Sequence, residues 1–215
     1  MPATSRSETK SPCSHIFILF KKEKEKNMQS VSPKYIVALV VAVALFAALK
    51  LLNPYREYST RQYWETATLA SVDEIPAEAL KEGNKNGSVL MWAAMSNPDT
   101  AVIRALVERG ADVNEADPLF SGTPLTGAAG YSKYPEIIKE LVALGADINK
   151  RVNNKETALM VTAQYNTNPG IVEELVSLGA DINSKNAQGK TALDLARTHK
   201  NQVVEDALIA LMREN

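Results

Sequence analysis

The stretch Gly110-Ala111-Asp112-Val113-Asn114 occurs twice more, with one conservative change, in this chain of 215 residues. It returns 35 residues later as Gly145-Ala146-Asp147-Ile148-Asn149, and 34 residues after that as Gly179-Ala180-Asp181-Ile182-Asn183. A fixed period in this range is typical of repeat proteins, in which each unit stacks only on its neighbours. The sequence therefore predicts an extended array of units, a form of protein that offers long binding surfaces.

A second phrase has the same period. In one unit it reads Thr123-Pro124-Leu125-Thr126-Gly127-Ala128-Ala129, and related phrases begin at Ser88, Thr157 and Thr191. The leucines of the four phrases are 35, 34 and 34 residues apart: Leu90, Leu125, Leu159 and Leu193. Together the two phrases resemble the ankyrin-repeat family, whose hallmarks are T-P-L-H-x-A-A and G-A-D-x-N. The resemblance covers roughly residues 64–215 and implies an all-α solenoid of stacked helix-turn-helix units with hairpin-like loops.

Local chemistry agrees with that fold. Thr123 can accept an N-cap hydrogen bond, and Pro124 is tolerated at the first helical position. Glycines such as Gly145 suit the left-handed position that ends a helix. Aliphatic residues at helical spacing predict the second helix of each unit. The predicted ranges are 101–109, 135–144, 169–178 and, in the last unit, 202–213, with Val203, Val204, Leu208 and Leu211 facing inward.

The chain departs from the family pattern in two ways. The position of the family's histidine holds Met91, Thr126, Met160 and Asp194 in the four units. The hydrogen bonds that this histidine makes in the family are therefore absent, which we expect to lower stability. Gly127 lies inside a predicted helix, where glycine costs about 1 kcal/mol relative to alanine.

The ends of the array are predicted to be degenerate. Residues 64–84 read as a first unit with helices over 66–71 and 74–82, closed by Gly83, and residues 191–215 read as the last unit. The predicted domain therefore holds three full repeats between two caps. Residues 53–63 are polar and rich in tyrosine, and they are predicted to form a stalk.

Residues 35–52 are apolar except for Lys50. As a helix this segment would be about 27 Å long, near the thickness of a hydrocarbon core. We favour a single transmembrane helix or signal anchor. Two alternatives are a cleaved signal peptide, with Ala42-Val43-Ala44 as the small-residue site, and a buried core helix, for which an ankyrin array has no place.

Basic residues are more numerous before this segment than after it, which favours an N-terminus inside and repeats outside. In a bacterium, outside would be the periplasm. Met28 is an alternative start, so residues 1–34 read as a disordered leader or a misassigned beginning. If Met28 is the start, the charge bias behind this orientation weakens.

Composition limits the classes of function. Residues 53–215 contain 16 basic and 22 acidic side chains, a balance of −6. Such an acidic domain is unsuited to nucleic acid, whose phosphates need a basic face, and it would suit a basic protein partner. The one cysteine, Cys13, lies in the leader, and the one histidine of the domain, His199, has no partner motif. We therefore predict no enzyme, cofactor, metal or small-molecule substrate, and we interpret Asp112, Asp147 and Asp181 as turn residues.

Candidate partner-binding residues fall on the loop tips and on the exposed side of the first helices, which in ankyrin proteins line a concave face. Tyr131, Tyr165 and His199 each lie six residues after an anchoring leucine, so they should form an aromatic ladder that either binds a partner or only covers aliphatic surface. Leu119 and Phe120 lie on the first tip, either packed on the array or exposed as an anchor. The remaining candidates are Lys150 and Arg151 on the basic second tip, and Gln164 beside the ladder.

The sequence is compatible with three functions. The leading hypothesis is a membrane-anchored protein whose repeats bind another protein outside the cytoplasm. The alternatives are a periplasmic immunity or inhibitor protein that neutralises an enzyme, and a scaffold or tether for a membrane complex. The sequence names no partner for any of them.

Overall fold

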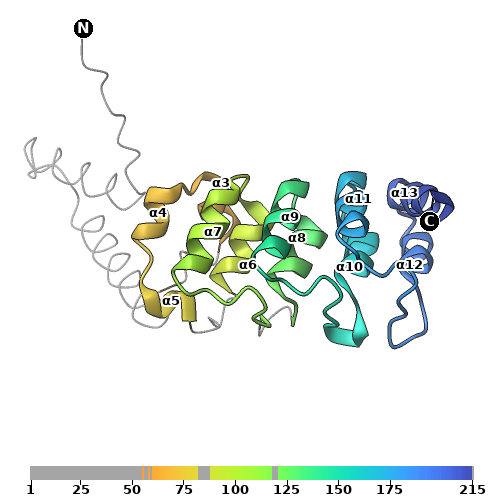
Figure 1. Cartoon of the computed structure of the whole chain (residues 1–215), viewed down its shortest axis with the longest axis horizontal. Helices are drawn as coiled ribbons and strands as arrows, with labels where there is room; N and C mark the ends of the chain where they lie inside the picture. The colour runs from red at the N-terminus through yellow and green to blue at the C-terminus, as the bar shows by residue number, and fades with distance from the viewer. Residues whose placement is uncertain (1–54, 56–57, 59, 82–87, 118–120, 215) are drawn as a thin grey trace, which may run out of the picture. The chain divides into compact units, whose positions relative to one another are not determined.

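The computed structural model describes residues 55, 58, 60–81, 88–117 and 121–214, all within the unit Asn53–Asn215. The secondary structure of these residues is helical (Figure 1), and four helix pairs follow one another along the chain. The pairs are α6 (Val89–Ser96) with α7 (Thr100–Glu108), α8 (Pro124–Tyr131) with α9 (Pro135–Ala143), α10 (Ala158–Tyr165) with α11 (Pro169–Ser177), and α12 (Ala192–Thr198) with α13 (Gln202–Glu214). The predicted all-α repeat architecture is confirmed.

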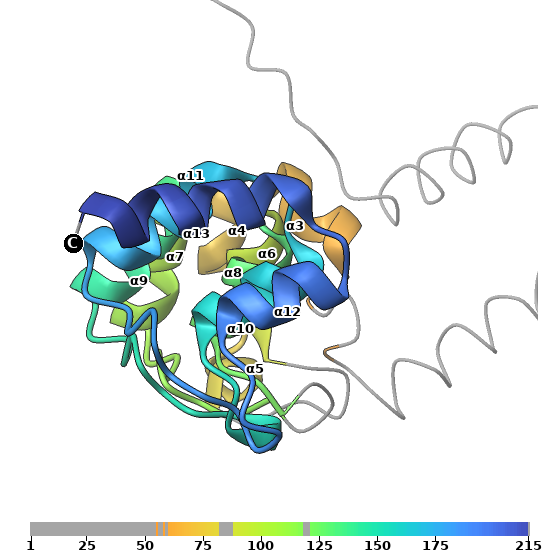
Figure 2. The same cartoon turned by 90° about the vertical axis from the view of Figure 1, so that its right-hand side faces the viewer.

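The helices pack in two rows. The first helices of the pairs, α6, α8, α10 and α12, contact one another in sequence, and α7, α9, α11 and α13 do the same (Figure 2). We call these the inner row and the outer row. Since each helix contacts its equivalent in the next pair, the hydrophobic core runs continuously along the array.

The two rows differ in how they fill this core. Inner helices contribute small residues: Ala128 and Ala129 are fully buried, so neighbouring helices can approach closely. Outer helices contribute aliphatic residues at helical spacing, such as Ile137, Ile138 and Leu141, which are also fully buried. The sequence pattern therefore determined which side of each helix faces the core.

Each outer helix of the first three pairs ends as predicted, at a glycine. Gly145 has a φ of 99°, and its N–H donates to Val142 O at 3.0 Å while the N–H of Ala146 donates to Leu141 O at 2.9 Å. This pair of hydrogen bonds is the Schellman motif, which needs a left-handed residue. Gly110 and Gly179 adopt the same conformation, and the predicted helix bounds are confirmed to within one residue.

The last helix differs from its prediction at one position. Val204 and Leu208 are fully buried and Leu211 packs against the core, but Val203 is 47% exposed. Successive helical residues point about 100° apart, so Val203 cannot share the buried stripe with Val204.

The helices predicted for the first unit, 66–71 and 74–82, are wrong. The chain instead forms α3 (Arg61–Thr66), α4 (Leu69–Asp73) and α5 (Ala77–Lys81). Ala67 is extended (φ −65°, ψ 140°), and a reciprocal capping box between Thr68 and Ser71 begins a new helix there. α3 packs on α6 and α4 on α7, so this cap extends both rows.

The stalk predicted over 53–63 overlaps this cap. α3 already begins at Arg61, and Tyr55, Tyr58 and Tyr63 pack partly buried against the core. The indole N–H of the fully buried Trp64 donates to Tyr58 O at 2.7 Å, which holds Tyr58 beside it. The repeat domain therefore begins earlier than residue 64.

The leader predicted over 1–34 and the membrane helix predicted over 35–52 lie outside the described residues. In the part of the chain that the structure does describe, no helix combines the length and the apolar character needed to cross a bilayer.

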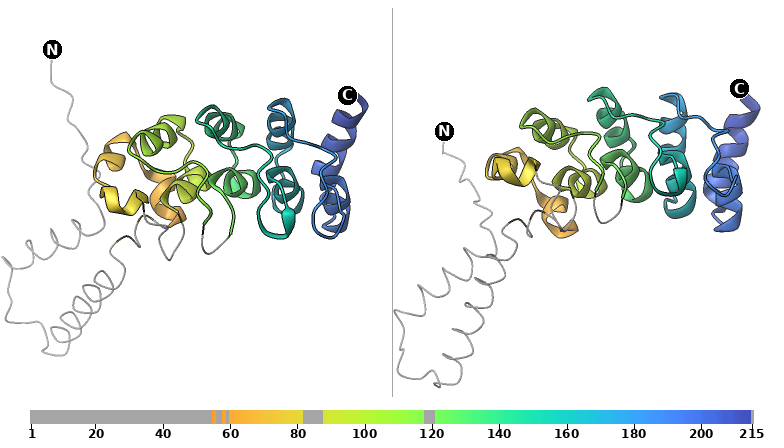
Figure 3. Two further views of the ribbon diagram at one scale, coloured as in Figure 1. Left: turned by 60° about the horizontal axis from the view of Figure 1, so that its bottom comes forward. Right: turned by 90° about the horizontal axis from the view of Figure 1, so that it is seen from below.

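Hairpin loops join each outer helix to the next inner helix, and they lie together along one edge of the array (Figure 3). The second loop closes through a hydrogen bond from Val152 N to Glu156 O at 2.9 Å and contains the short 3-10 helix η2 (Asn153–Lys155). The third closes in the same way, from Asn186 N to Lys190 O at 3.0 Å. These loops and the inner row border one face of the domain, which we call the inner face.

Candidate functional site

The aromatic ladder predicted from sequence is present on the inner face. The rings of Tyr131 and Tyr165 stack with centroids 5.8 Å apart and an interplanar angle of 22°, and the His199 ring lies 6.3 Å from that of Tyr165. Tyr131 is 45% exposed and Tyr165 is 54% exposed. A large part of each tyrosine ring remains in contact with solvent, and a binding role for the ladder stays a prediction.

The Tyr131 phenol remains neutral near neutral pH. Partial burial, with a smaller contribution from Tyr165, raises the pKa of Tyr131 above its ordinary value near 10. The Tyr131 hydroxyl is thus available as a hydrogen-bond donor and acceptor beside an apolar ring surface, a combination that is common at protein interfaces.

The residues predicted on the second loop have different surroundings. The guanidinium of Arg151 donates to Lys185 O at 3.0 Å, which links the second loop to the third. The Gln164 amide donates to the Glu156 carboxylate at 2.9 Å and to Met160 O at 3.3 Å, so it orients Glu156. Lys150 is exposed. Arg151 and Gln164 therefore already hold parts of the domain in place, and the exposed Lys150 is accessible to a partner.

Leu119 and Phe120, predicted on the first loop, lie outside the described residues. The loop is closed beside them by Asp117 N donating to Gly122 O at 2.7 Å, and the buried Asp117 carboxylate accepts a hydrogen bond from Ser88 N. Whether Leu119 and Phe120 pack on the array or form an exposed anchor for a partner stays a prediction.

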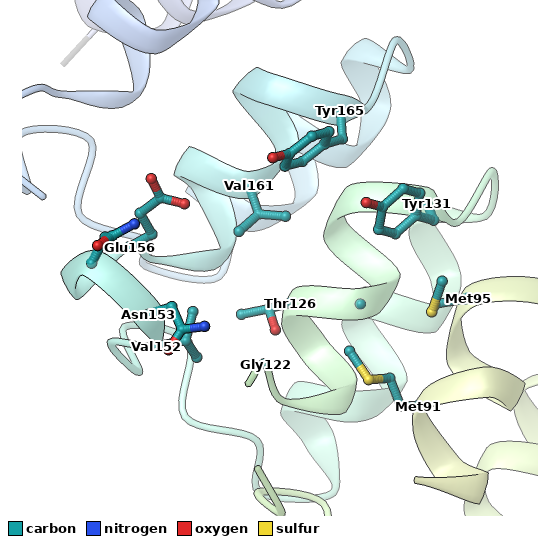
Figure 4. A pocket seen from close by; sticks show the side chains of 12 residues that line it. Met91, Met95, Gly122, Thr126, Tyr131, Val152, Asn153, Glu156, Val161 and Tyr165 are labelled. Atoms are coloured by element: carbon teal, nitrogen blue, oxygen red, sulfur yellow. The ribbon is translucent and has the colours of Figure 1, made fainter. Parts of the chain in front are cut away.

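The ladder borders a pocket of about 300 Å³ (Figure 4). Three consecutive repeats line it. The first contributes Met91 and Met95 of α6, and the third contributes Val161 and Tyr165 of α10. The remaining lining residues come from the second repeat and the loop after it: Gly122, Thr126, Gly127, Tyr131, Val152, Asn153, Asn154 and Glu156.

Gly127 forms part of the wall of this pocket. The equivalent residue of the other units is Trp92, Val161 or Leu195, so one side chain is missing from the row. A Cβ at Gly127 would lie 2.9 Å from Met91 Cγ, closer than such carbons pack, and at a tight 3.3 Å from Met95 Cγ. The glycine was predicted only as a cost to its helix; in the structure it also permits close packing of the two methionines beside the pocket.

Sequence reasoning missed Met91, Met95, Val161 and Glu156 as site residues. A signal existed in the comparison of units, because Gly127 is the smallest residue at its repeat position. Glu156 could not be placed from periodicity, since it belongs to a loop whose path depends on the contacts of η2.

The aspartates of the repeated turn act as predicted. Asp147 Oδ1 accepts from Asn149 N at 3.0 Å and Asp181 Oδ1 accepts from Asn183 N at 2.9 Å. A hydrogen bond from the Ser184 hydroxyl, and then one from the Asn183 backbone, lowers the pKa of Asp181. Across the described ranges no cluster of three or more His, Cys, Asp or Glu side chains has an arrangement that could hold a metal ion.

A family model described as ankyrin repeats (3 copies) matches residues 68–152 and 125–212, which together span more than half of the chain. The chain belongs to the ankyrin-repeat family. Ankyrin repeats typically act as non-catalytic modules for protein–protein interaction. A comparison with curated proteins found no match for this ankyrin-repeat chain.

Proposed function

We propose that this protein is a membrane-tethered ankyrin-repeat protein whose inner face binds another protein. The observation that supports this most directly is the exposed Tyr131–Tyr165–His199 ladder beside the pocket. Exposed tyrosines next to a pocket are typical of binding hot spots. A repeat array is also preformed, so its backbone loses little entropy when a partner binds.

The partner that we propose is basic. The balance of −6 over residues 53–215 attracts a positively charged protein at long range and repels acidic competitors. A domain that is concentrated at a membrane surface also meets its partner at a raised effective concentration when that partner lies at the same membrane.

The tether that we propose is the apolar segment 35–52, with the repeats outside the cytoplasm. Its length suits a bilayer, and the basic residues before it favour an internal N-terminus. Protease applied to intact spheroplasts should remove a C-terminal tag while a cytosolic control protein survives. Survival of the tag until lysis would place the repeats in the cytoplasm and contradict this part of the proposal.

The binding face is tested by site-specific photo-crosslinking in cells. A photoreactive residue at position 165 should give a discrete crosslinked product, whereas one at Glu173, exposed on the outer helix α11, should not. Tyr131→Ala should lower the yield from position 165, because losing a hot-spot tyrosine weakens binding by about 2 kcal/mol, roughly 30-fold. Equal products from both positions, or a product from position 173 alone, would show that the inner face is not the binding surface.

A further inference from the structure

The pocket on the inner face combines apolar walls with one carboxylate. Met91 and Met95 lie on one side, the rings of Tyr131 and Tyr165 border it, and Glu156 lies on the loop side (Figure 4). Its volume of about 300 Å³ is at the lower end of the range for ligand sites, roughly 300–1,000 Å³. The pocket is therefore suited to one long side chain of a partner protein.

Glu156 is half-buried and forms no ion pair within the described part of the chain. Its Oε2 accepts the hydrogen bond from Gln164, while no basic side chain of the described residues pairs with the carboxylate. The basic residues of the same loop, Lys150, Arg151 and Lys155, do not line the pocket. A carboxylate in such a place still has the capacity to accept charge-assisted hydrogen bonds.

We propose that this pocket binds an arginine side chain of the partner, an inference that rests on the proposed function and names its anchoring contact. The aliphatic stem would pack on Met91 and Met95, and the guanidinium would reach Glu156 beside the faces of Tyr131 and Tyr165. Arginine fits better than lysine because a planar guanidinium both stacks on aromatic rings and pairs with a carboxylate. The charges also favour arginine, since the domain is negative overall and the pocket is lined by the carboxylate of Glu156.

An apolar anchor is the main competitor for this pocket, because methionine and tyrosine form most of its wall. A leucine or phenylalanine would, however, remove water from Glu156 without providing a cation or a donor. Burying a charged group without a partner is unfavourable. The carboxylate therefore decides between the two occupants.

Methionine methyl NMR on the full-length protein tests this contact directly. The chain has six methionines, so a spectrum of methyl-labelled methionine holds few signals. Met91 and Met95 report on the pocket, while the buried Met160 and the α13 residue Met212 serve as internal references. The probes are N-acetylarginine amide, N-acetylcitrulline amide, which has nearly the same shape without the charge, and N-acetylleucine amide.

We expect N-acetylarginine amide to shift the Met91 and Met95 signals with a Kd in the millimolar range. Citrulline should bind at least about 10-fold more weakly. Glu156→Gln should remove the preference for arginine over citrulline, while the matched variant Glu173→Gln on α11 should retain it.

Three results would overturn the inference: equal shifts with citrulline, stronger binding of the leucine probe, or no shift of Met91 and Met95 with any probe. None of these would affect the proposed function itself, because crosslinking from position 165 tests the inner face independently of its anchor. Loss of that crosslink together with retained arginine binding would instead contradict the proposed function alone.

Discussion

At the scale of single residues, the third residue of each inner helix decides how that helix begins. Thr126 and Asp194 form reciprocal capping boxes with Thr123 and Thr191. Met160 cannot do so, and the Thr157 hydroxyl is buried without a partner. The loss expected from the missing histidines is therefore offset in two units, where a threonine or an aspartate supplies a cap.

Thr157 and Thr123 provide a matched pair of variants. Thr157→Val should raise the free energy of unfolding by about 1 kcal/mol, because it removes an unsatisfied buried hydroxyl and breaks no hydrogen bond. Thr123→Val should lower it by about 1 kcal/mol through loss of an N-cap. Urea unfolding followed by circular dichroism measures both. Equal destabilisation by the two variants would show that the Thr157 hydroxyl does have a partner.

At the scale of elements, the loops show where the chain is strained. The residue before the closing position is left-handed in each loop: Ser121 has a φ of 49°, Lys155 of 59° and Gly189 of 74°. Only the third loop has glycine there. Asn154, next to Lys155, is left-handed as well, with a φ of 56°. The second loop therefore contains two consecutive non-glycine residues in a conformation that L-residues disfavour, directly beside the proposed arginine pocket.

Relieving this strain should stabilise the domain. We expect Lys155→Gly to raise the free energy of unfolding by about 0.5–1 kcal/mol, since glycine adopts positive φ without steric cost. The reverse change in the third loop, Gly189→Lys, should lower it by about 1 kcal/mol. Thermal unfolding of the two variants measures the effect. A Lys155→Gly variant less stable than the wild type would mean that the lysine side chain contributes contacts that outweigh its backbone strain.

At the scale of the whole molecule, asparagines couple neighbouring repeats. Asn114 Nδ2 donates to Gly145 O at 2.9 Å and its Oδ1 accepts from Asp147 N at 3.0 Å. Asn149 does the same to Gly179 and Asp181. At the C-terminal end of the inner helix α10, Asn166 Nδ2 donates to two carbonyls of the preceding repeat, each at 2.9 Å. These bonds hold adjacent units in one register, which the ladder and the three-repeat pocket both require.

Breaking one such link should uncouple the end of the array. Asn149→Ala removes both bonds to the following repeat, so residues 179–214 should lose hydrogen-exchange protection by about 1–2 kcal/mol relative to residues 88–117. Asn183→Ala is the matched control, because among the described residues its side chain makes no hydrogen bond to the last unit, so its loss should leave protection nearly unchanged. A uniform loss of protection in the Asn149→Ala variant would show that the domain unfolds as one unit.

The sequence by itself determined the architecture, because a repeated phrase prescribes the same turn, the same glycine-ended helix and the same buried stripe in each unit. It also predicted the aromatic ladder, since residues at equivalent positions of stacked repeats must be neighbours. It failed at the first cap, where no repeated phrase fixes the register and local capping by Thr60 and Thr68 sets the helices. Only the tertiary structure revealed the pocket, because its walls come from three repeats, including Met91 and Met95, which pack closely against Gly127.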